Sequence, residues 1–261
     1  MTVTTDHTLT TDQPTTATAP AGTASTGLPE VVPPRSRDTR WELAAALRQL
    51  GRLGYEFGFN GHVSARATEA PGHYWVNPFG VSISTVTPAD LVLVDDRGEV
   101  VDPRGGQTIN GFAGNLALHQ QIPEAAVAIH LHTPRGFIWS NLGRPLRAVT
   151  TDAALVVGLQ GLSARIWGEE SGPTNVELAR AGKRVILQRG HGFVTWGGSV
   201  GEAAFYLWAA ERAADANLAL LGVAEPEVLS AELVTKWTLT PELARAHFEP
   251  AFTLAEAEGL R

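Results

Sequence analysis

The chain has 261 residues, 44% of them hydrophobic and 18% charged, which is typical of a globular protein large enough to bury a core. Its formal net charge of −7 argues against a general affinity for nucleic acid or anionic membranes, and the absence of cysteine excludes disulfides, thiolate metal ligands and a cysteine nucleophile. Because no apolar run reaches the ~20 residues that span a bilayer and no secretory pattern opens the chain, we expect a cytoplasmic protein.

The beginning of the chain differs in composition from the rest. Residues 1–37 are rich in Thr, Ala and Pro and contain almost no large apolar side chains. Such a segment buries too little surface to offset the entropy lost on ordering, so we expect a disordered tail. The patterns that follow predict a folded domain over 38–222 and a C-terminal helical extension over 223–261 that packs on the same domain.

Hydrophobic periodicity predicts the elements of the folded part. Apolar residues recur at helical spacing from Trp41 to Phe57, and Asp38 is placed to cap that helix. Further helices are predicted near 111–121, 136–141, 173–181 and 200–221, with two more in the extension. Strands are predicted near 62–66, 73–77, 91–95, 99–101, 126–131 and 184–188, whereas 146–162 shows no clear pattern. This irregular alternation predicts one α/β domain with a mixed sheet between helical layers.

Two histidines lie at the end of the apolar strand near 126–131. Because side chains alternate along a strand, His130 and His132 are expected on one face and Leu131 on the other. Two imidazoles placed in this way can share a metal ion at ~2.0–2.1 Å from each nitrogen. From these residues alone, the alternative that one imidazole is solvated and the other packs in the core stays open.

A third histidine follows the second apolar strand. His191 lies between Gly190 and Gly192, and such glycines let a backbone approach another group closely while the histidine side chain is exposed. By itself this residue is better explained as a loop histidine without a role.

The motifs of the chain occur in a characteristic order. They are the His-x-His after an apolar strand, His191-Gly192 after a second strand, Gly198-Ser199-Val200-Gly201-Glu202-Ala203 opening a long helix, His62-Val63-Ser64-Ala65-Arg66, and Asn77-Pro78-Phe79-Gly80. From about Trp41 to Leu221 this order resembles the class II aldolase/adducin family, in which the last two motifs usually read Gly-Asn-x-Ser-x-Arg and Thr-Pro-Ser-Gly.

The resemblance implies a three-layer α/β/α fold with a mixed, largely antiparallel central sheet. It also implies a divalent metal held by His130, His132 and His191, a small-molecule substrate, and a homotetramer with active sites between neighbouring subunits. It does not fix the reaction, because one fold supports many chemistries.

The sequence departs from the family pattern at two places. Aldolases of the family carry a glutamate at the position that corresponds to Gly111, and this chain has no carboxylate between Asp102 and Glu124. The sugar-phosphate enzymes bind phosphate with small hydroxyl and amide groups, at positions that here read His62, Asn77, Phe79, Ala113 and Gly114. These losses argue against a phosphorylated sugar and favour a larger, more apolar substrate.

Three imidazoles without a carboxylate leave a metal its full charge and open coordination positions. The leading hypothesis is therefore cleavage of a C–C bond next to the carboxylate of an aromatic or apolar 2-oxo or 2-hydroxy acid. With Fe(II) and dioxygen this would be an oxidative decarboxylation, as in the branch of the family that makes prenylated 4-hydroxybenzoate for aminocoumarin antibiotics. Two alternatives stay open: a Zn(II)-dependent, redox-neutral aldolase or decarboxylase, and a non-enzymatic adducin-like assembly module.

Five residues are expected to face the substrate: Ser64, Arg66, Asn77, Phe79 and Gly80. The planar fork of Arg66 suits a carboxylate, although an arginine on a strand is as often a structural ion-pair partner. Phe79 is equally well explained as core packing.

Three further residues are candidates near the metal. His62 and His119 could carry protons, with solvated or capping roles as the alternative. Asp152 could accept a hydrogen bond from a ligand imidazole, with a turn or cap role as the alternative.

Overall fold

A computed structural model of the chain describes residues 36–102, 104–109, 111–163 and 172–261. The expected tail over 1–37 therefore lies almost entirely outside the described residues. Of its two described residues, Arg37 pairs with Glu249 at 2.5 Å and with Glu256 at 2.8 Å. Every helix in the described ranges is too short or too polar to cross a membrane.

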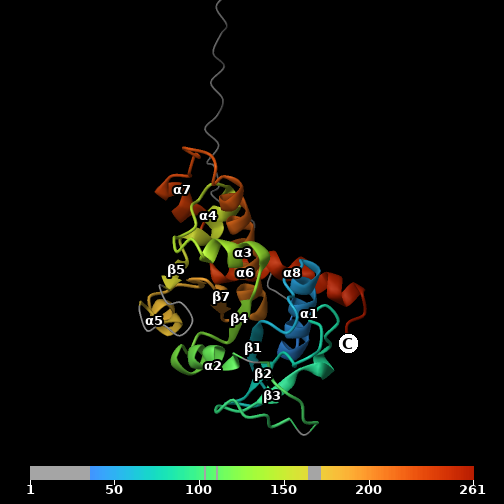
Figure 1. The fold of residues 1–261 in the computed structure, drawn as a ribbon. Helices are drawn as coiled ribbons and strands as arrows, with labels where there is room; N and C mark the ends of the chain where they lie inside the picture. The colour runs from blue at the N-terminus through green and yellow to red at the C-terminus, as the bar shows by residue number, and fades with distance from the viewer. Residues whose placement is uncertain (1–35, 103, 110, 164–171) are drawn as a thin grey trace, which may run out of the picture. The chain divides into compact units, whose positions relative to one another are not determined.

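Seven strands form one mixed sheet in the order β3-β2-β1-β4-β7-β6-β5 (Figure 1). Only β5 and β6 pair in parallel; the other neighbours are antiparallel. This is the mixed, largely antiparallel sheet that the sequence predicted. The strands are β1 (His62–Arg66), β2 (Tyr74–Val76), β3 (Val92–Val94), β4 (Val127–Leu131), β5 (Gln160–Ser163), β6 (Val185–Gln188) and β7 (Gly192–Gly197).

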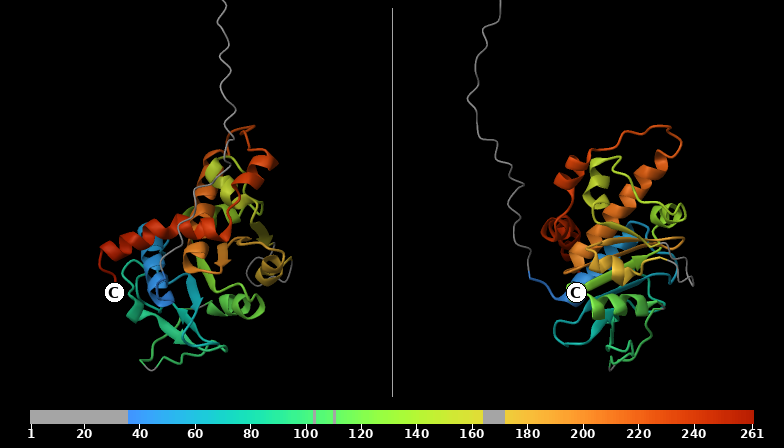
Figure 2. Two further views of the ribbon diagram at one scale, coloured as in Figure 1. Left: turned by 180° about the vertical axis from the view of Figure 1, so that it is seen from behind. Right: turned by 90° about the vertical axis from the view of Figure 1, so that its left-hand side faces the viewer.

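Helices cover both faces of the sheet and complete three layers (Figure 2). One layer packs α1 and α8 against α6, and the opposite layer holds α2 and α5. The helices are α1 (Thr39–Arg52), α2 (Phe112–Gln121), α3 (Pro134–Ser140), α4 (Thr151–Val157), α5 (Asn175–Arg180), α6 (Val200–Ala219), α7 (Ala231–Trp237) and α8 (Pro241–Ala257), with a short 3-10 helix, η1 (Pro88–Asp90).

The central strand β4 separates two apolar cores. Val127, Ile129 and Leu131 belong to the large core that contains residues of α1, α6 and α8. Ala128 belongs instead to a smaller core with Leu118 of α2. Because strand side chains alternate, His130 follows Ala128 onto the α2 face, opposite Leu131 as predicted.

The elements differ from the sequence predictions in several places, one of which is β7, for which no separate strand was predicted. Helix α1 ends at Arg52 and not near Phe57, because the chain turns at Gly54, whose φ is +77°. The strand expected at 99–101 is reduced to one bridge between Val94 and Val100. The unclear stretch 146–162 contains α4, capped by the side chain of Thr150, and the beginning of β5.

Candidate metal centre

The three histidines predicted as metal ligands converge at one end of β4. His130 is the fourth residue of that strand, His132 follows it, and His191 lies in the turn between β6 and β7. One ring nitrogen from each lies within 4.8 Å of the others, and the rings of His130 and His191 stack with centroids 4.6 Å apart. In the described ranges, no aspartate or glutamate joins this group.

A backbone hydrogen bond sets the orientation of His130. Its Nδ1 donates to the carbonyl of Phe193 on β7 at 2.8 Å, so the lone pair of the neutral ring lies on Nε2. That Nε2 is buried and has no hydrogen-bond partner. A buried acceptor without a partner, facing two further imidazoles, fits a divalent metal ion.

The protonation states of the three rings also suit a metal. Burial lowers the pKa of His130 well below its ordinary value, and it lowers the pKa values of His132 and His191 as well. The rings are therefore neutral at physiological pH, which is the form that binds metal.

His62 lies beside the cluster and against Gly111, the position at which aldolases of the family carry a glutamate. It pairs with His130 across β1 and β4, and the two ring centroids lie 4.9 Å apart. A Cβ at Gly111, which has a φ of +96°, would lie 2.6 Å from Cδ2 and 3.0 Å from Nε2 of His62. The imidazole of His62 and a side chain at position 111 therefore exclude one another. Burial lowers the pKa of His62 to about 4.

His119 and Ser64 lie inside the protein, away from the surface. The two ring nitrogens of His119 bond to Ser64 Oγ at 2.8 Å and to the carbonyl of Ala125 at 2.7 Å. His119 is 1% exposed and Ser64 is 0% exposed. Neither nitrogen of His119 is left for a substrate, so this arrangement gives no support to the predicted proton transfer.

Arg66 and Asn77 both bond to the backbone. Arg66 Nη2 donates to the carbonyls of His119 and Ile122 and so satisfies the end of α2. Asn77 Oδ1 accepts from the amide of Val63 at 2.8 Å. These bonds hold β1 against its neighbours, and the guanidinium of Arg66 points at carbonyl groups and not at an open site.

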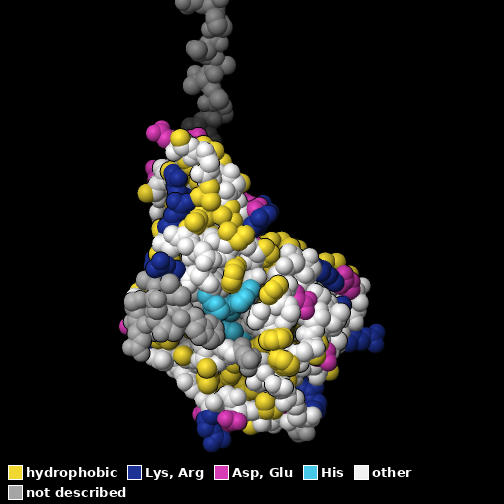
Figure 3. Space-filling view, in the orientation of Figure 1, with side chains coloured by type: hydrophobic (Ala, Val, Ile, Leu, Met, Phe, Trp, Pro, Cys, Tyr) yellow, Lys and Arg dark blue, Asp and Glu magenta, His cyan; other side chains and the backbone are white. Residues whose placement is uncertain are grey.

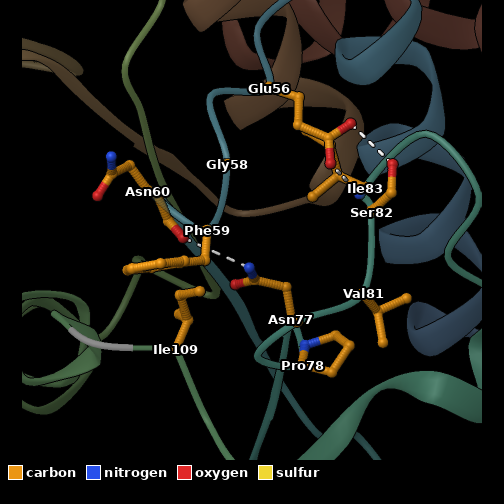
Figure 4. A pocket seen from close by; sticks show the side chains of 12 residues that line it. Glu56, Gly58, Phe59, Asn60, Asn77, Pro78, Val81, Ser82, Ile83 and Ile109 are labelled. Atoms are coloured by element: carbon orange, nitrogen blue, oxygen red, sulfur yellow. Dashed lines mark hydrogen bonds between the residues drawn. The ribbon is translucent and has the colours of Figure 1, made fainter.

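A cavity of about 230 Å³ lies between the segments 56–61 and 77–83 (Figure 4). Asn77 and Gly80, two of the predicted substrate residues, line it together with Phe59. Gly61 also lines it, and a Cβ there would lie 3.0 Å from the carbonyl oxygen of His130. Gly61 therefore packs on the backbone of a candidate ligand, although His130, His132 and His191 do not themselves line the cavity.

Exposed aromatic rings flank this region. Phe79 and Phe59 pack with centroids 5.0 Å apart, and they are 37% and 55% exposed. Phe137 is also 37% exposed and lies 5.1 Å from His132. Figure 3 shows hydrophobic side chains gathered beside the histidines on this face. Phe79 therefore lies at the surface and not in the core.

Asp152 lies in the first turn of α4, where it pairs with Arg212. Its Oδ2 accepts from Arg212 Nε and Nη2 at 2.9 and 2.6 Å, and both side chains are largely exposed. Asp152 was expected to accept a hydrogen bond from a ligand imidazole. For His130 the acceptor is instead the backbone carbonyl of Phe193, and no sequence motif identifies that carbonyl.

Comparisons with known proteins agree with this geometry. The model of the family described as class II aldolase and adducin N-terminal domain matches residues 41–218. The chain is 30% identical over 196 residues to decarboxylase NovR of Streptomyces niveus, covering 73% of this chain and 72% of the relative. It is 32% identical over 169 residues to a 4-hydroxy-3-prenylphenylpyruvate oxygenase/4-hydroxy-3-prenylbenzoate synthase of Streptomyces roseochromogenus subsp. oscitans, covering 62% and 61%.

A solved structure has the same architecture. The L-fuculose 1-phosphate aldolase of Glaciozyma antarctica PI12 superposes with a TM-score of 0.76 at 25% identity, covering 85% of this chain and 91% of the aldolase. The predicted three-layer fold is confirmed.

The buried imidazoles predict how the metal-free protein responds to acid. The pKa values of His62 and His119 are both lowered to about 4, whereas an unfolded histidine titrates near ~6.5. Between these values the unfolded chain binds more protons, so the free energy of unfolding decreases as the pH falls from about 6.5 to 4, by at most ~3 kcal/mol per group. Urea unfolding across this range should show that the free energy of unfolding decreases less steeply with falling pH for His119→Gln than for the parent. Carboxylates titrate in the same range, but they contribute equally to both proteins and cancel in the comparison. An equal pH dependence of the two free energies of unfolding would contradict the lowered pKa of His119.

The contact between His62 and position 111 can be measured with a double-mutant cycle. Gly111→Ala introduces both the clash with His62 and the strain of a positive φ, whereas in a His62→Ala background only the strain remains. We expect Gly111→Ala to cost about 1–3 kcal/mol less in that background. Gly72→Ala is the control, because Gly72 has a φ of +78° and nothing near its Cβ. The same cost for Gly111→Ala in both backgrounds would show that the imidazole of His62 does not exclude a side chain at position 111.

Proposed function

Because this chain belongs to the class II aldolase and adducin family, we propose that it is a metal-dependent enzyme that cleaves a C–C bond next to a carboxylate. The substrate we propose is an aromatic or otherwise apolar 2-oxo or 2-hydroxy acid, such as a prenylated 4-hydroxyphenylpyruvate or 4-hydroxymandelate, with dioxygen as oxidant. One observation carries the proposal: three neutral imidazoles converge beside exposed aromatic rings, and no carboxylate of the described residues joins them.

His130, His132 and His191 would hold the metal, Fe(II) or Zn(II). When bound, such a metal supplies Lewis acidity, and Fe(II) also supplies electron transfer to dioxygen. The protein's own part is to keep the three rings neutral by burial and to hold the lone pair of His130 Nε2 toward the site.

The lack of a carboxylate base suits an oxidative reaction. When a 2-oxo acid takes up one dioxygen and releases one carbon dioxide, the product is a 2-hydroxy acid shorter by one carbon with the same number of hydrogens. No net proton is then exchanged with the protein. A redox-neutral aldolase needs a group that removes a proton, and a side chain at position 111 would overlap the imidazole of His62.

The aromatic rings support an apolar substrate. Phe79 and Phe59 form one exposed pair and Phe137 lies beside His132, so an aryl or prenyl group could be covered on two sides. Two relatives named for decarboxylation and for oxygenation of a prenylated arylpyruvate point the same way. Among the predicted substrate residues, we assign contacts with the substrate to Asn77, Phe79 and Gly80, and a structural role to Ser64 and Arg66.

We also infer that the enzyme is a cytoplasmic homotetramer. The family supports the assembly, and the absence of cysteine is in keeping with a reducing compartment.

A Zn(II)-dependent, redox-neutral aldolase or decarboxylase is the second candidate. The superposition on an L-fuculose 1-phosphate aldolase favours it. It would require a proton-accepting group that the described residues do not place beside the three histidines.

Dioxygen uptake separates the two candidates. The metal-free protein would be reconstituted anaerobically with Fe(II) or Zn(II) and mixed with 4-hydroxyphenylpyruvate, 4-hydroxymandelate or their 3-prenyl forms. We expect uptake of dioxygen and release of carbon dioxide in equal amounts with Fe(II) alone. Cleavage with Zn(II) and no uptake with either metal would establish the redox-neutral reaction, and a His191→Ala variant controls for metal bound elsewhere.

Replacement of Phe79 tests whether the exposed pair of Phe59 and Phe79 contacts the substrate. Phe79→Ala removes the ring that packs on Phe59, so we expect KM for the 3-prenyl substrate to increase roughly tenfold with little change in kcat. Leu254→Ala on α8, which removes an exposed apolar side chain elsewhere, should leave both constants unchanged. An unchanged KM for Phe79→Ala would remove this residue from the substrate site.

A further inference from the structure

The short helix α3 touches all three segments that carry the candidate ligands. His132 lies two residues before its first residue, Pro134, and its last residue, Ser140, contacts the turn that carries His191. Its middle packs on Phe193, whose carbonyl orients His130.

A buried carboxylate fixes the beginning of α3. Glu211 of α6 accepts from the amides of Arg135 and Gly136, at 2.6 Å each. Glu211 is 5% exposed, so these bonds are shielded from water. They attach the first turn of α3, which begins two residues after His132, to the longest helix of the described chain.

Ser140 holds the turn that carries His191 on both sides of that residue. The amide of Gly192 donates to Ser140 Oγ at 3.1 Å, and the amide of Gly190 donates to the Ser140 carbonyl at 3.3 Å. Ser140 is 1% exposed, and its hydroxyl in turn donates to the carbonyl of Phe137 at 2.8 Å. One buried residue thus anchors both neighbours of His191.

Close packing joins the middle of α3 to Phe193, whose carbonyl accepts from His130. A Cβ at Gly136 would lie 2.3 Å from the ring of Phe193, so the helix rests directly on that ring. The helix cannot shift without moving β7, and β7 supplies the carbonyl that accepts from His130 Nδ1.

We propose that α3 preorganises the metal site, and that Ser140 is a positioning residue that sets the place of His191 relative to His130 and His132 before the metal binds. This inference rests on the metal site of the proposed function and not on its reaction. Groups of this kind, which hold ligands without touching the metal, typically change metal affinity by roughly 10–100-fold.

The test compares two buried hydroxyl groups. Ser140→Ala leaves the Gly192 amide without its acceptor, whereas Thr195→Val removes a buried hydroxyl of β7 that bonds to the carbonyl of Ala203 and to no ligand segment. Metal affinity would be measured by competition with a chelator, using Zn(II) and Co(II), and the visible spectrum of the Co(II) protein would report the ligand geometry. Urea unfolding of the metal-free variants measures the purely structural loss.

We expect Ser140→Ala to bind both metals about 10–100-fold more weakly and to change the Co(II) spectrum, and Ser140→Thr, which keeps the hydroxyl, to recover most of the affinity. Thr195→Val should lose stability without losing affinity. Glu211→Gln provides a second variant, expected to weaken metal binding through the segment that follows His132.

Parental metal affinity in both Ser140→Ala and Glu211→Gln would overturn the inference, and so would a parent that binds no metal. A parent that binds metal but consumes no dioxygen would refute the proposed oxidation and leave the role of Ser140 intact.

Discussion

The hydrogen bond from His130 to the carbonyl of Phe193 is the constraint on which the site depends. It lies between the two central strands, where water cannot compete, and it decides which nitrogen of His130 is free. Because β4 pairs with β1 on one side and β7 on the other, the same strand also brings His62 and the turn of His191 to one place. The pairing of these three strands thus brings histidines from three distant parts of the sequence together.

Much of the fold follows from periodicity in the sequence. Alternation along β4 separates Ala128 from Leu131 as predicted, and the family resemblance predicted the three layers. Periodicity failed at 146–162, where a seven-residue helix and a four-residue strand are too short to show a period. It failed again at 53–57, where apolar residues continue the helical spacing after the backbone has turned at Gly54.

The surroundings of the three histidines were harder to predict than their convergence. Arg66 and His119 have side chains suited to catalysis, yet each bonds to a backbone carbonyl. The packing of α2 on the sheet decides which backbone carbonyls lie within reach of these side chains. Sequence patterns do not reveal that packing. Asp152 was given a role near the metal, and in the structure its carboxylate accepts from Arg212 on α6. The loss of a carboxylate at Gly111 was visible in the sequence, but its steric counterpart, the ring of His62, was not.

Helix α8 shows that the folding unit of this chain is longer than its family domain. The family match ends at residue 218, yet Phe248 and Phe252 of α8 are at most 1% exposed and complete the core against α1 and α6. Trp41, at the start of that match, donates to the carbonyl of Leu260, and Arg37 pairs with two glutamates of α8. The two ends of the folded part therefore close one core together. A domain boundary drawn from family similarity would therefore cut through the hydrophobic core.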